Sequence, residues 1–195
     1  MLNSNYRPLI TVKLPAPIRR QCYMHSFDLK KPTVPKGFDD YLPTVIQLCL
    51  AADAIDGMAH ATFDEKLVKA GMSQRRPKPH VDGCFIPASM DWGHTGGGWA
   101  HGCNNIPIED MARMPVIIAA SAIGCKAWRG AFDGEPKNDG DLSHISHLLD
   151  EGEVLRAHTG YLLSPDCIHE SLIMDEDTPR TFLRIALPNK FRPTF

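Results

Sequence analysis

Apolar and polar residues alternate along several short stretches of this chain, which is the pattern of half-buried β-strands. The alternation is clear over residues 9–14 and 180–187. Residues 115–121 and 125–132 are expected to be buried strands separated at Gly124, and residues 152–163 to form a strand, a turn and a second strand. Over 180–187, the residues that share one face with each other are Arg180, Phe182, Arg184 and Ala186. The pattern predicts a mainly β protein with many short strands.

Helical periodicity is strongest over residues 38–57. Two aspartates stand at its start, Pro43 falls in the first turn and Gly57 is a plausible stop; the apolar stripe consists of Leu42, Val45, Ile46, Cys49 and Leu50. Residues 61–71 allow two interpretations, because Thr62 and Glu65 have the spacing of a helix capping box, yet the same stretch could be a strand. A second short helix is predicted at 142–149, with Ser143 as its cap. We therefore expect flanking helices around the sheets.

Composition indicates an ordinary soluble protein of one domain. The chain has 195 residues, 43% of them hydrophobic, and a net charge of −2, which gives no general case for nucleic acid or a membrane. No apolar run approaches membrane-spanning length, and the N-terminus does not resemble a signal peptide. The six cysteines form no Cys-x-x-Cys pair, so we interpret them as reduced thiols of a cytoplasmic protein; a cysteine-based zinc site is a weaker alternative.

One local charge bias stands out against this background. Seven Lys or Arg residues and a single acid, Asp28, occupy residues 1–36. A solvated pair of strands is the simpler explanation. A patch for an acidic partner such as nucleic acid is the functional one.

A metal-binding pattern is centred on His80-Val81-Asp82. In an extended segment His80 and Asp82 point to the same side, so an imidazole and a carboxylate can take adjacent positions on one divalent metal. The third ligand must come from elsewhere, and His169 is our candidate. His94 and His101 compete with it, but they lie in a glycine-rich stretch and lack an aspartate partner. Two histidines and one carboxylate on one face of a metal are the arrangement of non-haem iron(II) oxygenases.

Two arginines follow His169 on the same face of a strand. Arg180 comes eleven residues after it and Arg184 four residues later. Inward arginines on an apolar strand are costly to bury unless they meet an anion. The order of His-x-Asp, a distant His and then Arg resembles the iron(II)/2-oxoglutarate-dependent oxygenases, and the two arginines four apart resemble the taurine dioxygenase-like branch. The resemblance covers residues 78–187 as a pattern of anchors.

The resemblance implies a double-stranded β-helix, a jelly-roll or cupin-like barrel, in which His80 and Asp82 end one strand and His169 lies on a facing strand. Residues 1–195 would then form one oxygenase domain, with N-terminal strands and a packing helix at 1–75 and a metal-bearing barrel core at 76–188. Iron(II), 2-oxoglutarate and O2 are the implied cofactor and cosubstrates, and hydroxylation is the implied reaction. Arg180 would pair with the distal carboxylate of 2-oxoglutarate; Arg184 would share that role or hold an anionic substrate.

The stretch 92–105 carries the candidate substrate contacts. A triple glycine lies between two tryptophans there, and the residues placed to contact substrate are Trp92, Trp99, Asn104 and Asn105. A surface loop whose tryptophans pack as anchors is the alternative. Two other functions stay open: a cupin-like metal- or ligand-binding barrel without 2-oxoglutarate, and an oxygenase that modifies nucleic acid by stacking bases on Trp92 or Trp99. The substrate and the oligomeric state do not follow from the sequence.

Overall fold

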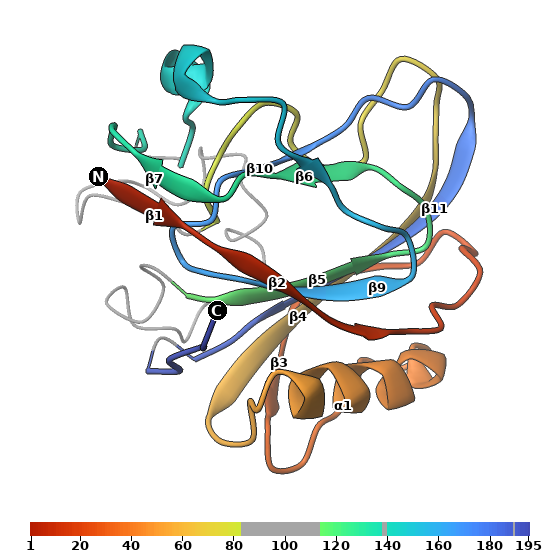
Figure 1. The fold of residues 1–195 in the computed structure, drawn as a ribbon. Helices are drawn as coiled ribbons and strands as arrows, with labels where there is room; N and C mark the ends of the chain where they lie inside the picture. Colours follow the sequence, from red (N-terminus) through yellow and green to blue (C-terminus); the bar gives the residue numbers. More distant parts are fainter. Residues whose placement is uncertain (83–113, 138–139, 189) are drawn as a thin grey trace, which may run out of the picture.

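The computed structural model describes residues 1–82, 114–137, 140–188 and 190–195, and it is built mainly from antiparallel strands. A six-stranded sheet has the order β2-β9-β5-β11-β4-β3, and a three-stranded sheet has the order β10-β6-β8 (Figure 1). The strands of the large sheet are β2 (Tyr6–Thr11), β3 (Gln21–Asp28), β4 (Met58–Val68), β5 (Val116–Ala120), β9 (Thr159–Leu163) and β11 (Thr178–Ala186). The small sheet contains β6 (Cys125–Ala127), β8 (Glu153–Val154) and β10 (His169–Ser171), and a separate pair is formed by β1 (Leu2–Ser4) and β7 (Gly130–Phe132).

Along the chain from β4 onward, strands belong alternately to the large and the small sheet, as in a jelly roll. The segment around His80 forms a bridge to His169 and so extends the small sheet beyond β10. With this segment included, the small sheet reads His80 segment-β10-β6-β8, and four strands of the large sheet read β4-β11-β5-β9. Successive strands therefore cross from one sheet to the other, except between β6 and β8. The expected β-rich jelly-roll fold is confirmed.

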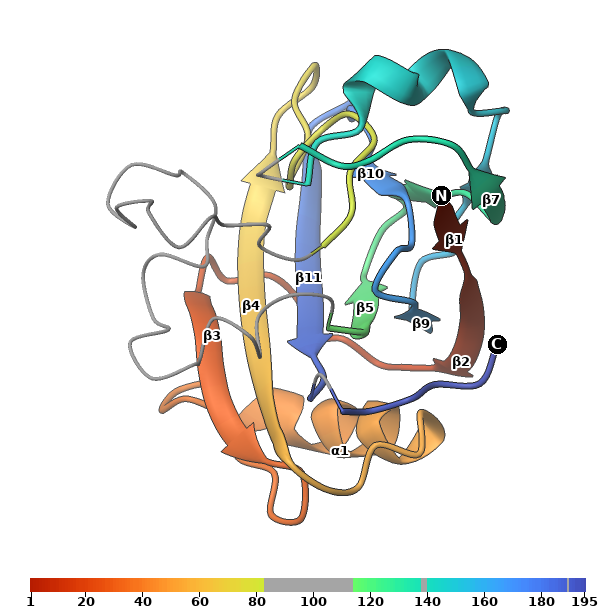
Figure 2. The ribbon, with the colours of Figure 1, turned by 90° about the vertical axis from the view of Figure 1, so that its left-hand side faces the viewer.

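The alternation along β11 separates two apolar cores. Phe182 and Ala186 pack between the sheets with Val116, Ile118 and their neighbours. Leu183 and Ile185 point to the other side of the large sheet, where they pack with Phe63 and with helix α1 (Leu42–Ala51). Figure 2 shows α1 lying across one end of β3, β4 and β11. Burying both faces explains why β11 is almost entirely buried.

The first predicted helix is shorter than its periodicity suggested. A 3₁₀ turn, η1 (Asp39–Tyr41), leads into α1, which ends at Ala51 and not at Gly57. The chain leaves the helix at Asp53, whose φ of 64° is left-handed. The buried face contains Leu48, whereas Leu50, assigned to the stripe from sequence, is 61% exposed. Gly57 has a different role: with a φ of 103°, a Cβ there would lie 2.8 Å from Pro188.

Three other local predictions are settled by hydrogen bonding. Residues 61–71 are mostly strand, since β4 pairs with β11 from His60 to Val68, so the capping-box interpretation is wrong. The stretch 125–132 divides into β6 and β7, which pair with different partners. The second helix is a 3₁₀ helix, η2 (Ser143–Leu148), capped by Leu142 without a side-chain bond; the Ser143 hydroxyl bonds Asp141 instead.

Candidate metal centre

The two histidines of the predicted triad are direct cross-strand neighbours. The backbone N–H of His80 donates to the carbonyl of His169 at 3.0 Å, and the N–H of His169 donates back to the carbonyl of His80 at 2.9 Å. Their rings are 4.4 Å apart between centroids. The prediction that His169 lies on a facing strand is therefore wrong, because the two residues are paired within one sheet. Paired strands lie about 4.8 Å apart and stacked sheets about 10 Å apart, so pairing within a sheet brings the two rings closer together.

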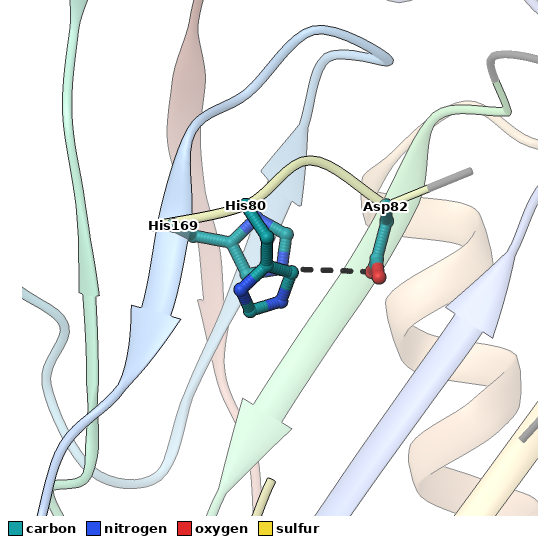
Figure 3. Close-up of side chains that lie close together, drawn as sticks. All are labelled: His80, Asp82 and His169. Atoms are coloured by element: carbon teal, nitrogen blue, oxygen red, sulfur yellow. Dashed lines mark ion pairs between the residues drawn. The ribbon is translucent and has the colours of Figure 1, made fainter. Parts of the chain in front are cut away.

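Asp82 completes the cluster from the same segment as His80. Val81 points away from the metal centre and is buried against Trp128 and Ile168, so His80 and Asp82 both project to the opposite side. The Asp82 Oδ2 atom is 3.6 Å from the Nε2 atom of His169 (Figure 3). One ligand atom from each of the three residues lies within 4.8 Å of the others, so the group could hold a metal ion.

Backbone carbonyls orient both imidazole rings. The Nδ1 atom of His80 lies 2.8 Å from the carbonyl of Lys78, and the Nδ1 atom of His169 lies 3.0 Å from the carbonyl of Cys167. A carbonyl only accepts, so each Nδ1 carries the proton and each Nε2 keeps its lone pair for a metal. Lys78 presents its carbonyl from a left-handed backbone conformation with a φ of 77°.

Electrostatics favour the ligand-competent form of all three side chains. Burial lowers the pKa of His80 well below its usual value and also lowers the pKa of His169, so both rings are neutral at pH 7. Burial, the largest single influence, would raise the pKa of Asp82, but the neighbouring groups that favour the carboxylate, Arg184 most of all, together outweigh burial and hold this pKa below its usual value. Two neutral imidazoles and one carboxylate are a donor set that suits iron(II).

Arg184 contacts the triad directly. Its Nε atom donates to Asp82 Oδ2 at 2.8 Å, and its side chain is only 7% exposed. A hydrogen bond to a ligand carboxylate fixes that carboxylate's orientation, as outer partners of metal ligands generally do. Of the two roles that the sequence left open for Arg184, neither included this contact.

Arg180 is buried deeper in the barrel. Its side chain is fully enclosed, and it donates to the carbonyl of Ala122 at 3.2 Å, to Gln74 Oε1 at 2.5 Å and to Cys125 Sγ at 3.3 Å. All three partners are neutral, and no carboxylate pairs with Arg180 in the part of the chain that the structure describes. A buried guanidinium without a counter-ion is unusual, because desolvation of a charge is costly.

Several predicted contacts lie outside the described residues. These are the proposed substrate contacts Trp92, Trp99, Asn104 and Asn105, together with the rival ligands His94 and His101. Four of the six cysteines are described, and all four, Cys22, Cys49, Cys125 and Cys167, are free thiols. Among the helices of the described segments, none is long and apolar enough to cross a membrane.

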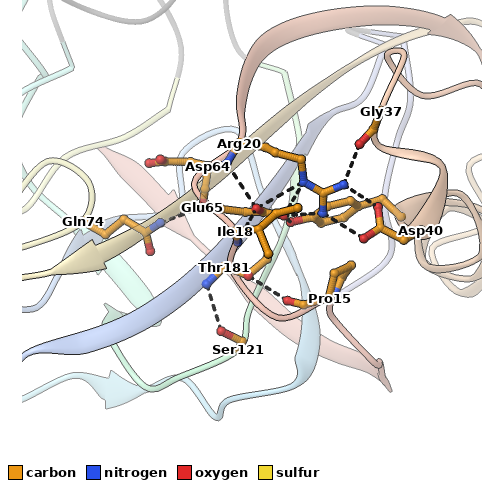
Figure 4. Close-up of polar contacts among 11 residues, drawn as sticks. Pro15, Ile18, Arg20, Gly37, Asp40, Asp64, Glu65, Gln74, Ser121 and Thr181 are labelled. Atoms are coloured by element: carbon orange, nitrogen blue, oxygen red, sulfur yellow. Dashed lines mark hydrogen bonds and ion pairs between the residues drawn. The ribbon is translucent and has the colours of Figure 1, made fainter.

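Sequence reasoning missed the polar residues of β4. Asp64 and Glu65 are both fully buried and project from opposite faces of the strand (Figure 4). Glu65 faces the helix side and bonds Arg20 and Tyr41, whereas Asp64 faces the barrel interior beside Phe182. The alternation of residues 58–68 could have identified them, but the capping-box spacing competed with it.

Comparison with known proteins adds one distant similarity. No family model matches the chain, and no curated protein matches it. Among solved structures it is similar to a prolyl-4-hydroxylase from Pseudomonas putida, with 14% sequence identity and a TM-score of 0.41, over 88% of this chain and 74% of that chain. Conclusions about function therefore rest on the side chains of this protein.

Proposed function

We propose that this protein is a non-haem iron(II)- and 2-oxoglutarate-dependent dioxygenase that hydroxylates its substrate. The observation that carries the proposal is the convergence of His80, Asp82 and His169, with both Nε2 atoms available and the carboxylate held by Arg184. Three protein ligands on one side of an iron(II) ion leave its other positions for small molecules. Bound iron(II) with 2-oxoglutarate and O2 supplies an oxidant for C–H bonds.

The chain's own residues have separate tasks in this proposal. His80, Asp82 and His169 bind the metal, the carbonyls of Lys78 and Cys167 keep the two rings in the correct tautomer, and Arg184 orients the carboxylate. The apolar residues between the sheets exclude water from the barrel interior.

Arg180 is the residue we assign to the distal carboxylate of 2-oxoglutarate. It is buried, it has no acidic partner among the described residues, and a planar guanidinium suits two-pronged binding of a carboxylate. The distance between Arg180 and the metal ligand His169 also fits the length of 2-oxoglutarate. Arg180 reaches Cys125, which is paired with Ser171, two residues beyond His169. Two residues of strand span about 7 Å, comparable with the length of a five-carbon dicarboxylate.

The proposal can be tested without knowing the substrate. Purified protein should be mixed anaerobically with iron(II) and then with 2-oxoglutarate, while visible absorption is recorded. We expect a weak charge-transfer band that forms with both components and is absent from the His169→Ala variant. His147→Ala is the matched control, because His147 is an exposed histidine of η2.

The same experiment separates the proposal from a cupin-like barrel. Metal binding without any spectral or calorimetric response to 2-oxoglutarate would favour a metal- or ligand-binding barrel that does not use the 2-oxo acid. Absence of metal binding by the wild-type protein would reject both metal-dependent functions.

A further inference from the structure

Arg75 presents an unusual guanidinium inside the barrel. Its Cζ atom lies 5.6 Å from the ring centroids of both Tyr23 and Phe182, so aromatic rings pack close to the group. Its side chain is 28% exposed, and its nearest charge is Asp64, whose Oδ2 atom is 3.5 Å from Nη1. Within the described residues the guanidinium makes no hydrogen bond. The five N–H donors of this fork are therefore positioned, and none of them makes a hydrogen bond to a described residue.

Asp64 lies beside Arg75 but accepts no hydrogen bond from its guanidinium. The Oδ1 atom of Asp64 accepts a hydrogen bond from Gln21 at 2.7 Å, whereas Oδ2 is buried and has no hydrogen-bond partner in the described part of the chain. Two cations approach Oδ2 without bonding it: Lys66 at 3.4 Å and Arg75 at 3.5 Å. Two positive charges against one negative charge leave this cluster with a net charge of +1.

A second arginine shows how this chain satisfies a guanidinium that has a structural role. On the other face of β4, Arg20 bonds both oxygens of Glu65, both oxygens of Asp40 and the carbonyl of Gly37 (Figure 4). Arg129, which also lies over a tyrosine ring, donates to the carbonyl of Tyr6 at 2.6 Å. Arg75 differs from both because its fork has no hydrogen-bond acceptor among the residues that the structure describes. A preorganised donor fork with access to solvent is the arrangement that binds carboxylate or phosphate.

The position of Arg75 connects this cluster with the metal centre. Its backbone N–H donates to the hydroxyl of Ser171, two residues after the ligand His169. Phe182, on which it packs, lies between Arg180 and Arg184 on the inner face of β11. An anion on Arg75 would therefore lie in the same interior as the metal and the cosubstrate.

We propose that Arg75, assisted by Lys66, binds an anionic group of the substrate, a carboxylate or a phosphate. As a substrate subsite it rests on the proposed oxygenase function; as an anion-binding site it does not. Arg180 holds the cosubstrate and Arg75 holds the substrate, so the two arginines respond to different ligands.

Arginine Nε–Hε NMR signals of ¹⁵N-labelled protein test this assignment directly. The Arg75 signal is identified by its loss in Arg75→Lys, and the Arg180 signal by its loss in Arg180→Lys. The protein is titrated with inorganic phosphate and with acetate, first alone and then with zinc(II) and 2-oxoglutarate present. We expect 2-oxoglutarate to shift the Arg180 signal and at least one of the two anions to shift the Arg75 signal saturably; the anion that binds more tightly identifies the group.

Variants separate binding from a structural effect. Arg75→Gln should weaken binding of the anion about tenfold or more, since it removes a charge-assisted pair, while Arg129→Gln, the matched control, should leave it unchanged. Asp64→Asn should strengthen binding, because it removes the negative charge beside the fork. Melting temperatures measured on each variant identify any that is misfolded, and Arg75→Lys, which keeps the charge and loses the fork, should bind with intermediate affinity.

The possible failures are distinguishable. If 2-oxoglutarate shifts Arg180 but neither anion shifts Arg75, the subsite is rejected and the oxygenase proposal stands. If an anion shifts Arg75 while 2-oxoglutarate shifts nothing, the cosubstrate assignment is rejected and the anion site stands. If 2-oxoglutarate itself shifts Arg75 and competes with phosphate, Arg75 belongs to the cosubstrate and the proposal is wrong.

Discussion

Glu65 should be one of the residues on which the stability of this fold depends most. Its side chain is fully buried, and its two oxygens accept hydrogen bonds from the backbone N–H groups of Ile18 and Arg20, from the Arg20 guanidinium and from the Tyr41 hydroxyl, at distances from 2.6 to 3.2 Å. This network fixes the segment before β3 and the start of α1 against β4. Glu65→Ala would leave all of these donors without their acceptor.

The expected cost follows from what is left unpaired. Removing one partner of a buried ion pair generally costs about 3–5 kcal/mol, because the other charge stays buried. Arg20 keeps its contacts with Asp40 and Gly37, and its side chain is 19% exposed, which favours the lower half of that range. Even about 3 kcal/mol is a large fraction of the roughly 5–15 kcal/mol by which a typical domain is stable. Urea unfolding followed by far-ultraviolet circular dichroism measures the difference.

Asp40→Asn is the matched control, since Asp40 pairs with the same arginine but is 46% exposed. An exposed pair is worth about 1 kcal/mol or less. Equal losses in Glu65→Ala and Asp40→Asn would show that burial of the network does not matter, and the reasoning above would be refuted.

The pH dependence provides an independent check on Glu65. Burial, the largest single influence, would raise the pKa of Glu65, but the hydrogen bonds from the Arg20 and Tyr41 side chains and from the backbone N–H groups of Ile18 and Arg20 together outweigh burial, so the folded-state pKa is lowered. The unfolded chain then binds the proton more readily. The stabilisation is complete above the unfolded pKa of about 4.3 and is lost as the pH falls through the lower folded value. Wild-type protein should therefore lose stability below about pH 4 more steeply than Glu65→Gln.

Further predictions concern the metal centre, the cosubstrate and the core. His169→Ala should abolish tight binding of cobalt(II) in calorimetry, and wild-type affinity in that variant would exclude the proposed triad. Arg184→Gln should weaken metal binding roughly 10- to 100-fold by releasing the carboxylate ligand, with Arg184→Lys less affected; unchanged metal affinity with weaker 2-oxoglutarate binding would make Arg184 a cosubstrate anchor instead. Arg180→Ala should raise the dissociation constant for 2-oxoglutarate about 100-fold, a loss of about 3 kcal/mol, and leave metal affinity intact. Leu48→Ala should destabilise the fold by about 2–5 kcal/mol in urea unfolding, whereas Leu50→Ala, at an exposed position of the same helix, should change stability by less than about 0.5 kcal/mol.

The sequence alone identified the residues that come together in the candidate metal centre. Alternation put His80 and Asp82 on one side of an extended segment and Arg180 and Arg184 on one face of β11, and the structure has both arrangements. These predictions succeeded because side-chain direction in a strand depends only on the local backbone. For the same reason the mainly β class was predictable. The helix predicted at residues 38–57 overlaps α1, but the prediction extended the helix past its actual end at Ala51.

Only the tertiary structure decided what those residues contact. His80 and His169 are paired across neighbouring strands, Arg184 bonds Asp82, and Arg180 is enclosed by neutral groups. Each contact joins segments about ninety to a hundred residues apart or depends on the depth of a side chain in the barrel. A local sequence pattern predicts neither the pairing of distant segments nor the depth of a side chain. The N–H donors of Arg75, which make no hydrogen bond to the described residues, are another feature that only the tertiary structure shows. They became visible only when strand pairing placed a buried carboxylate and two aromatic rings beside an arginine that, in the sequence, is one of several basic residues before a histidine.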